Sequence, residues 1–144
     1  MRSEVRIRAF EDRDEEAVVA LWQRCGLLRP WNDPRKDIAR KRRVQRELFL
    51  VGELGGAIVG SAMGGYDGHR GWVNYLAVDT AHRRLGLGRA LMSALETRLL
   101  ELGCPKLNLQ VRDDNTAALA FYERLGYRQD AAVSLGKRLE SDQP

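Results

Sequence analysis

An arginine- and glycine-rich turn at residues 83–90 is the part of the sequence best suited to holding an anion. It reads Arg-Arg-Leu-Gly-Leu-Gly-Arg-Ala and precedes a long amphipathic segment. Gly86 and Gly88 let the backbone approach a ligand closely, and the first amides of a following helix point toward negative charge. Arginine side chains can hold phosphate oxygens through paired hydrogen bonds. The turn therefore predicts a pyrophosphate site, with a plain glycine turn and surface arginines as the alternative.

This turn differs from the two best-known phosphate-binding loops. The dinucleotide fingerprint needs glycines at its first, third and sixth places near the first strand, and the P-loop ends in Gly-Lys-Ser or Gly-Lys-Thr. Residues 83–90 match neither pattern. A phosphate-binding loop of another kind is therefore expected.

The elements that must position the turn follow from the spacing of apolar residues. The expected strands are residues 5–9, 48–54, 57–63, 72–78 and 106–111, and the expected helices are residues 12–25, 34–46, 87–102 and 115–125. One or two further strands are expected between Tyr127 and Leu139. Strand, long helix and strand in this order form a right-handed crossover, so residues 72–78 and 106–111 should be parallel neighbours.

Composition excludes several classes of protein. A chain of 144 residues fits one domain and can bury a core without disulfides or a metal. Cys25 and Cys104 are far apart, and His69 and His82 lack metal-ligand spacing, so no metal site is expected. The sequence has neither an apolar stretch of about 20 residues nor the apolar region of a signal peptide, which predicts a cytoplasmic protein with no membrane partner.

Positive charge is concentrated in one segment, residues 35–46. The net charge of the chain is +4, but this segment holds seven arginines and lysines against a single acid, Asp37. It is either a patch for an acidic partner or a solvated helix whose last turns favour cations. Periodic aromatics for base stacking are absent there, so no nucleic acid partner is expected.

The turn and the segments around it resemble the GNAT superfamily of N-acetyltransferases. The acetyl-CoA pyrophosphate turn of that superfamily reads Arg or Gln, two residues, Gly, one residue, Gly or Ala, and Arg83, Gly86 and Gly88 match it. The next motif of the superfamily is similar to Asn115, Ala118, Phe121, Tyr122, Leu125, Gly126 and Tyr127. Residues 27–34, 64–71 and 134–139 are similar to the bacterial YpeA-type acetyltransferases, so the likeness runs nearly end to end.

The resemblance implies the fold and the cofactor. It implies one α/β (α+β) domain over residues 1–144, with a mixed central sheet of about six to seven strands and about four helices. Strand 72–78 should carry a bulge and splay from strand 106–111, which opens a V-shaped slot for acetyl-CoA. The residues that the resemblance places on the cofactor are Leu76, Ala77, Val78, Arg83, Arg84, Gly86, Leu87, Gly88, Arg89, Ala90, Asn115, Ala118 and Tyr122.

The resemblance also implies direct transfer of the acetyl group to an amine, with a strand amide near Leu76 on the carbonyl oxygen. No Ser-His-Asp or Cys-His set is evident that would form an acyl-enzyme. Tyr122 is the candidate general acid for the CoA sulfur, because Ala118, four residues earlier, is small enough to leave its hydroxyl a path. The alternative is a core tyrosine that packs with Phe121 and Leu125.

The general base stays open at this point. Many members of the superfamily place a glutamate on the strand that leads into the slot, where this sequence has Asn74 and Tyr75. Asp67, His69, Glu53 or a water relay could take the proton. His69 is favoured because imidazole exchanges protons near neutral pH, and the alternative is an exposed loop histidine.

The family layout implies an acceptor pocket formed by two segments. These are residues 31–33, with Trp31 and Asp33, and residues 66–69, with Tyr66 and Asp67. The two aspartates would attract a cationic amine. Asp33 also precedes Pro34 and could serve only as a helix N-cap.

Three functions compete on this sequence. The first is acetyl-CoA-dependent N-acetylation of a primary amine on a small molecule, peptide or protein. The second is a catalytically degenerate CoA-binding regulatory domain, because the strand glutamate is missing. The third is a basic nucleic-acid-associated protein that uses residues 35–46. The sequence does not identify the acceptor, and it is compatible with a homodimer without requiring one.

Overall fold

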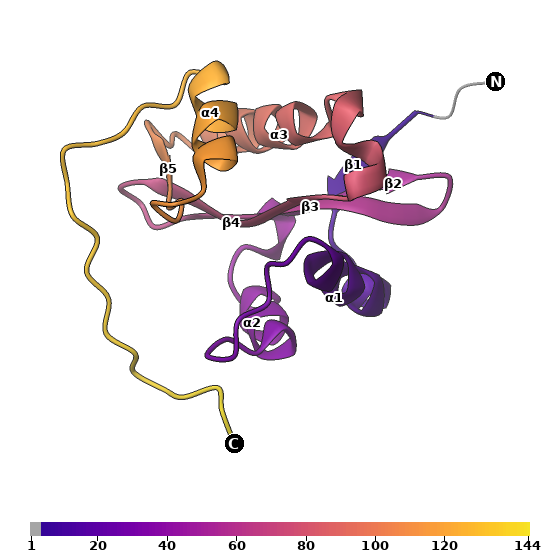
Figure 1. The fold of residues 1–144 in the computed structure, drawn as a ribbon, viewed down its shortest axis with the longest axis horizontal. Coiled ribbons are helices and arrows are strands. Elements are labelled where there is room, and N and C mark those ends of the chain that lie inside the picture. The colour runs from indigo at the N-terminus through magenta and orange to yellow at the C-terminus, as the bar shows by residue number, and fades with distance from the viewer. Residues whose placement is uncertain (1–3) are drawn as a thin grey trace.

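One mixed sheet organises the molecule, as the computed structural model shows for residues 4–144 (Figure 1). The side chain of Arg84 lies outside the described part. The sheet has the order β1-β2-β3-β4-β5, in which the first four strands are antiparallel and β5 is parallel to β4. The strands are β1 Arg6–Ala9, β2 Phe49–Leu54, β3 Ala57–Tyr66, β4 Gly71–Val78 and β5 Leu107–Leu109.

Helices cover both faces of this sheet. Helices α1 and α2 lie on one face, and α3 and α4 lie on the other (Figure 1). Their bounds are α1 Glu15–Arg24, α2 Pro34–Lys41, α3 Leu87–Glu101 and α4 Thr116–Arg124, and short 3-10 helices span Asp12–Asp14, Arg46–Leu48 and Thr80–Leu85. Between residues 4 and 144 no helix combines the length and apolarity needed to cross a bilayer.

Apolar spacing explains why two cores form. Val18, Leu21 and Trp22 recur at helical spacing on α1 and are fully buried against the sheet. On the opposite face, Leu91 and Leu95 of α3 are fully buried in a second cluster. The sheet between the two clusters is therefore held from both sides.

The starts of α2 and α4 agree with the sequence predictions, whereas α1 begins at Glu15, after a 3-10 turn, rather than at Asp12. Asp33 caps α2, because its carboxylate accepts hydrogen bonds from the amides of Arg35 (2.9 Å) and Lys36 (3.3 Å). The side chain of Asn115 accepts one from the Ala118 amide (3.1 Å) at the start of α4. Each of these polar side chains marks the start of a helix that contributes residues to the central cavity.

The predicted helix over residues 34–46 is too long. Helix α2 ends at Lys41, and the chain turns through Gln45, whose φ is +52°. The amide side chain of Gln45 pairs with both the backbone N–H (2.7 Å) and the carbonyl (2.9 Å) of Tyr66. These hydrogen bonds hold Gln45 at the end of β3, so the chain leaves the helical path after Lys41 despite its local helix propensity.

The predicted number of strands, six to seven, is too high, because the strands expected near the C-terminus do not form. The sheet of residues 4–144 has five strands, and no strand forms between Tyr127 and Leu139. The tail first meets β5 only through side chains, since Asp130 accepts hydrogen bonds from Lys106 and Asn108 (both 2.8 Å). It then runs past the sheet toward α2 (Figure 1), where Asp142 pairs with Arg40 at 2.6 Å.

A buried ion pair joins β1 to the segment before α1. Two nitrogens of Arg8 contact the two carboxylate oxygens of Asp14, at 2.7 and 2.9 Å, and both side chains are less than 10% exposed. Asp14 also accepts a hydrogen bond from the Glu11 amide (2.9 Å). Burial alone would raise the pKa of Asp14, but these hydrogen bonds outweigh it and lower the pKa.

Candidate active site

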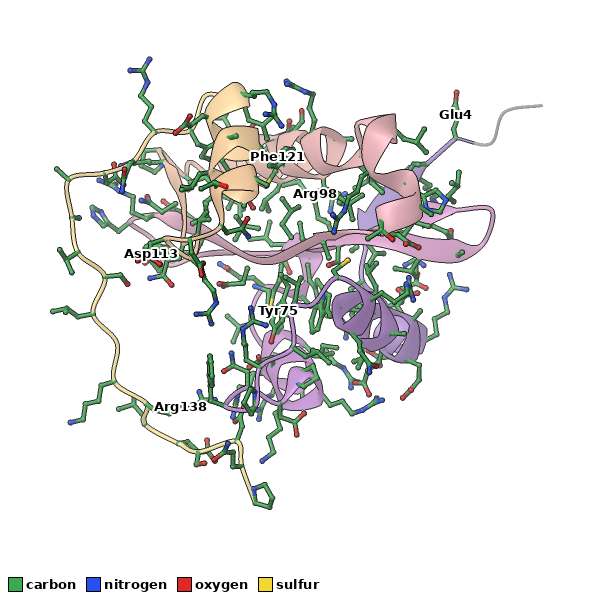
Figure 2. All side chains as sticks on the ribbon, viewed as in Figure 1. Glu4, Tyr75, Arg98, Asp113, Phe121 and Arg138 are labelled. Atoms are coloured by element: carbon green, nitrogen blue, oxygen red, sulfur yellow. The ribbon has the colours of Figure 1, made fainter. Side chains whose placement is uncertain are left out.

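A bulge in β4 at Tyr75 shapes the centre of the molecule. The register with β3 shifts between Ser61 and Met63, and Tyr75 has a φ of +52°, which is unusual for a large side chain. The ring of Tyr75 stacks on Trp22 with centroids 3.7 Å apart, and the Tyr75 carbonyl accepts a hydrogen bond from Ser61 Oγ (2.8 Å). Figure 2 shows Tyr75 on the side of the sheet that carries α1 and α2. Packing therefore holds the strained residue in place.

The parallel strands β4 and β5 separate after Val73, where the bulge in β4 begins. Their parallel pairing covers only residues 71–73 with residues 107–109. A cavity of about 680 Å³ opens past that point, between residues 73–76 of β4 and residues 109–112 after β5. The bulge and splay that the family resemblance implied are confirmed.

Helix α4 brings three of the expected residues to this cavity. Asn115, Ala118 and Tyr122 all line it, because spacings of three and four residues place them on one side of the helix. Tyr122 also borders a second cavity, of about 1270 Å³, along β5 and the tail. Burial raises the pKa of Tyr122 to about 12, so its hydroxyl keeps its proton at neutral pH.

The turn at residues 83–90 forms the start of α3, as expected. Gly86 precedes the helix with a φ of +71°, and a Cβ there would meet nothing within 4 Å. Gly88 is buried, and a Cβ on it would lie 3.0 Å from Cζ of Phe121 on α4. Arg83 and Arg89 are exposed beside the open first turn of α3. These features suit an anion on the helix N-terminus.

Gly86 offers a direct test of this turn. Gly86→Val should lower the affinity for acetyl-CoA by about tenfold or more, because valine disfavours positive φ and its side chain enters the space that a phosphate needs. Gly56→Val is the matched control, since Gly56 has a φ of +83° with equally open surroundings at the β2–β3 turn. Isothermal titration should show the loss in Gly86→Val alone, and equal affinity in both variants would contradict a phosphate role for the turn.

The other cofactor candidates on β4 divide into two groups. Leu76 lines the cavity, whereas Ala77 and Val78 do not. Ala77 is buried under α1, and the Val78 carbonyl accepts hydrogen bonds from Cys25 Sγ (3.3 Å) and Arg83 Nε (3.4 Å). A contact of Ala77 or Val78 with the cofactor stays a prediction.

The structure does not bring the expected base candidates to the cavity. Asp67 and His69 lie in the turn between β3 and β4, and neither lines either cavity. The Asp67 carboxylate accepts hydrogen bonds from the amides of Arg70 (2.7 Å) and His69 (2.8 Å), which lower its pKa. Glu53 contacts Arg8 on β1 at 3.3 Å instead. A catalytic role for Asp67 or His69 stays a prediction that the cavity lining does not support.

None of the four expected acceptor residues, Trp31, Asp33, Tyr66 and Asp67, lines the cavity. Asn32 lines it, while its neighbours Trp31 and Asp33 do not. The Arg112 guanidinium lies 5.6 Å from the centroid of the Trp31 ring, which bridges the two walls. Tyr66 is on the far end of β3 and bonds Gln45 through its backbone. Substrate binding by Trp31, Asp33, Tyr66 and Asp67 stays a prediction.

Helix α2 contributes residues that the sequence analysis did not assign to the site. Asp37, Arg40 and Lys41 line the cavity, while Ile38 between them is buried in the core. The Tyr75 hydroxyl donates a hydrogen bond to one oxygen of Asp37 (2.6 Å), and Arg40 contacts the other (3.1 Å). The available signal was Asp37 itself, the only acid in the basic segment 35–46.

A bulged strand separates from its parallel neighbour beside the N-terminus of α3, which is the arrangement that the resemblance to the GNAT superfamily implied. The chain belongs to the acetyltransferase (GNAT) family, which matches residues 8–127. It is an N-acetyltransferase, and its cofactor is acetyl-CoA. The open space at Gly86 and the exposed Arg83 and Arg89 fit the phosphates of that cofactor.

Known proteins of the same kind resemble it over most of their length. An acetyltransferase of Yersinia enterocolitica is 55% identical over 137 residues, which cover 95% of this chain and 97% of that protein. The ribosomal-protein-S18-alanine N-acetyltransferase of Escherichia coli is 30% identical, with a TM-score of 0.75 over 89% of this chain and 80% of that one. An aminoglycoside N-acetyltransferase, AAC(6')-Iy, solved in complex with CoA shares the fold at 16% identity, with a TM-score of 0.78 over 96% and 97% of the two chains.

Proposed function

We propose that this protein transfers the acetyl group of acetyl-CoA directly to a primary amine, with Tyr122 as the general acid. The observation that carries the proposal is the position of Tyr122. It lines the cavity where β4 and β5 separate, on the same side of α4 as Asn115 and Ala118. With its pKa raised to about 12 by burial, Tyr122 can donate a proton and does not act as a base at neutral pH.

The chain's own groups define the remaining roles. Leu76 lies just past the bulge and borders the cavity, so its amide is proposed to donate a hydrogen bond to the acetyl carbonyl oxygen. Acetyl-CoA supplies the acetyl group and leaves as a thiol, whose sulfur receives the proton of Tyr122. Neither Cys25 nor Cys104 lines the cavity at Tyr75, which favours direct attack by the amine over an acyl-enzyme.

Binding and turnover can be tested separately. Acetyl-CoA should raise the melting temperature, because a ligand of the folded state stabilises it by about 2.7 kcal/mol at one hundred times its dissociation constant. Release of the CoA thiol should then require an amine. An unchanged melting temperature at millimolar acetyl-CoA would contradict the cofactor role. Stabilisation without thiol release across a broad panel of amines would instead indicate the CoA-binding regulatory domain.

A further inference from the structure

The cavity at Tyr75 carries more positive than negative charge. Among the residues that the structure describes, its lining includes Arg29, Arg40, Lys41 and Arg112 but only one acid, Asp37. Acetyl-CoA does not account for this excess, since the turn at residues 83–90 that suits its phosphates contributes nothing to the lining. The positive charge is therefore available to a second ligand of the cavity, the acceptor substrate.

One of the four cations is already neutralised within the chain. Arg40 contacts Asp37 at 3.1 Å and the tail residue Asp142 at 2.6 Å. The Asp142 side chain is 1% exposed and also accepts a hydrogen bond from the Asp33 amide (2.9 Å). Arg40 thus has two carboxylate partners and needs no ligand.

The other three cations have no carboxylate partner in residues 4–144. Arg29 donates only to the backbone carbonyls of Gly26 (2.9 Å) and Leu28 (3.0 Å), and Arg112 lies against the Trp31 ring. Lys41 makes no ion pair in this range, and burial lowers its pKa. Arg29 and Lys41 are half-buried, whereas Arg112 is exposed. A half-buried cation without a counter-charge is unfavourable, and an anionic ligand would supply that charge.

Asp37 provides the complementary feature at the same cavity. Its oxygens accept from the Tyr75 hydroxyl and from Arg40, and each carboxylate oxygen has a second acceptor site. A protonated amine could therefore hydrogen-bond to Asp37 without displacing either partner. The cavity presents one site for an ammonium group beside three sites for anionic oxygens.

We propose that the acceptor is a primary amine that itself carries carboxylate groups, such as an acidic amino acid. Asp37 binds its ammonium group, and Arg29, Lys41 and Arg112 bind its carboxylates. This assignment rests on the proposed function. The bound ammonium group first gives one proton to solvent, because only the neutral amine can attack. In the transfer the thioester C–S bond breaks and an amide C–N bond forms, the nitrogen loses a second proton, and the CoA sulfur gains one. No oxidation or reduction takes place.

The test compares an acidic amino acid with its amide analogue, which lacks the carboxylate charges, and with a polycationic amine. Thiol release at saturating acetyl-CoA is measured for glutamate, for glutamate with both carboxylates converted to amides, and for spermidine. The kcat/KM for glutamate should exceed the values for the other two by at least tenfold, and it should fall as salt rises. A higher kcat/KM for spermidine or the diamide would overturn the assignment.

Charge reversal in the cavity sharpens the test. Lys41→Glu should lower kcat/KM for glutamate at least tenfold and raise it for spermidine, with the acetyl-CoA thermal shift unchanged. Lys41→Met, which keeps the aliphatic packing, should lower the glutamate value without favouring spermidine. Arg43→Glu is the matched control, because Arg43 is exposed in the same basic segment and does not line the cavity.

The outcomes separate this inference from the proposed function. If acetyl-CoA did not raise the melting temperature of the wild-type protein, the proposed function itself would be overturned. An intact shift with equal effects of Lys41→Glu and Arg43→Glu on glutamate would overturn only the acceptor assignment. An intact shift with no acetylation of glutamate would overturn it as well.

Discussion

Tyr122→Phe should lower kcat by about 100-fold or more, while the acetyl-CoA affinity and the melting temperature change little. The substitution keeps the ring, which packs edge-on against Phe121 (5.1 Å between centroids) and Tyr127 (5.8 Å), and removes only the hydroxyl. Without that proton donor the CoA sulfur must leave as a thiolate. Steady-state thiol release with a saturating amine measures the effect.

Tyr127→Phe provides the matched control for this prediction. It removes a hydroxyl from the same aromatic cluster, but the Tyr127 hydroxyl hydrogen-bonds to Glu96 and Tyr127 does not line the cavity at Tyr75. Its kcat should stay near the wild-type value. Full activity in Tyr122→Phe, or a joint loss of stability and activity, would make Tyr122 a core tyrosine only.

The pH dependence of the wild-type enzyme follows from the same residue. Because the pKa of Tyr122 is raised to about 12, the acid stays protonated through pH 7 to 10. The value of kcat/KM should therefore rise across this range as the acceptor amine loses its proton, with no fall caused by Tyr122. If kcat/KM fell with rising pH below pH 10 in the wild type but not in Tyr122→Phe, the Tyr122 hydroxyl would be losing its proton in that range, which would contradict this prediction.

Arg8→Met should lower the free energy of unfolding by about 3–5 kcal/mol, because it leaves the carboxylate of Asp14 buried without its cation. Denaturant unfolding at pH 7 measures this loss. Arg13→Met is the control: its pair with Glu11 is exposed, with 70% and 54% of the side chains accessible, and should contribute about 1 kcal/mol or less. Equal losses in the two variants would contradict the importance of the buried pair.

Acid should reduce the contribution of this pair in a defined direction. The folded state lowers the pKa of Asp14, so the stabilisation is present above the ordinary pKa of aspartate and is lost as pH falls through the folded value. The difference between wild type and Arg8→Met should shrink over that acidic range. Arg8→Met combined with Asp14→Leu should recover part of the loss at pH 7, because the buried carboxylate of Asp14 is removed and only the less buried Glu53 loses its contact with Arg8.

Local sequence signals predicted much of the fold. The cap at Asp33, the start of α3 after Gly86 and the parallel pair β4–β5 all depend on short-range chemistry or on a general connection rule. One or two strands were also expected between Tyr127 and Leu139, yet the apolar side chains of Val133, Leu135 and Leu139 in that range are 86–91% exposed. Apolar residues in an extended segment form a strand only where a neighbouring strand can pair with it. The sequence does not reveal whether such a neighbour is present.

The part of the site on α2 could not be predicted for a related reason. Asp37 faces Tyr75, which lies 38 residues further along the chain. That contact depends on the bulge in β4 and on how α2 packs on the sheet, neither of which leaves a local pattern at Asp37. The basic segment 35–46 was visible in the sequence, but the side of α2 that turns toward the cavity was not.

The contact between Gly88 and Phe121 limits how this enzyme can be engineered. Any side chain added at Gly88 would push on Phe121, whose ring lies against that of Tyr122 (Figure 2 labels Phe121 on α4). The turn that we expect to hold the phosphates therefore packs directly against the helix that carries the proposed acid. A redesign for bulkier acyl groups would best leave this contact intact and vary the walls that β4 and the residues after β5 provide.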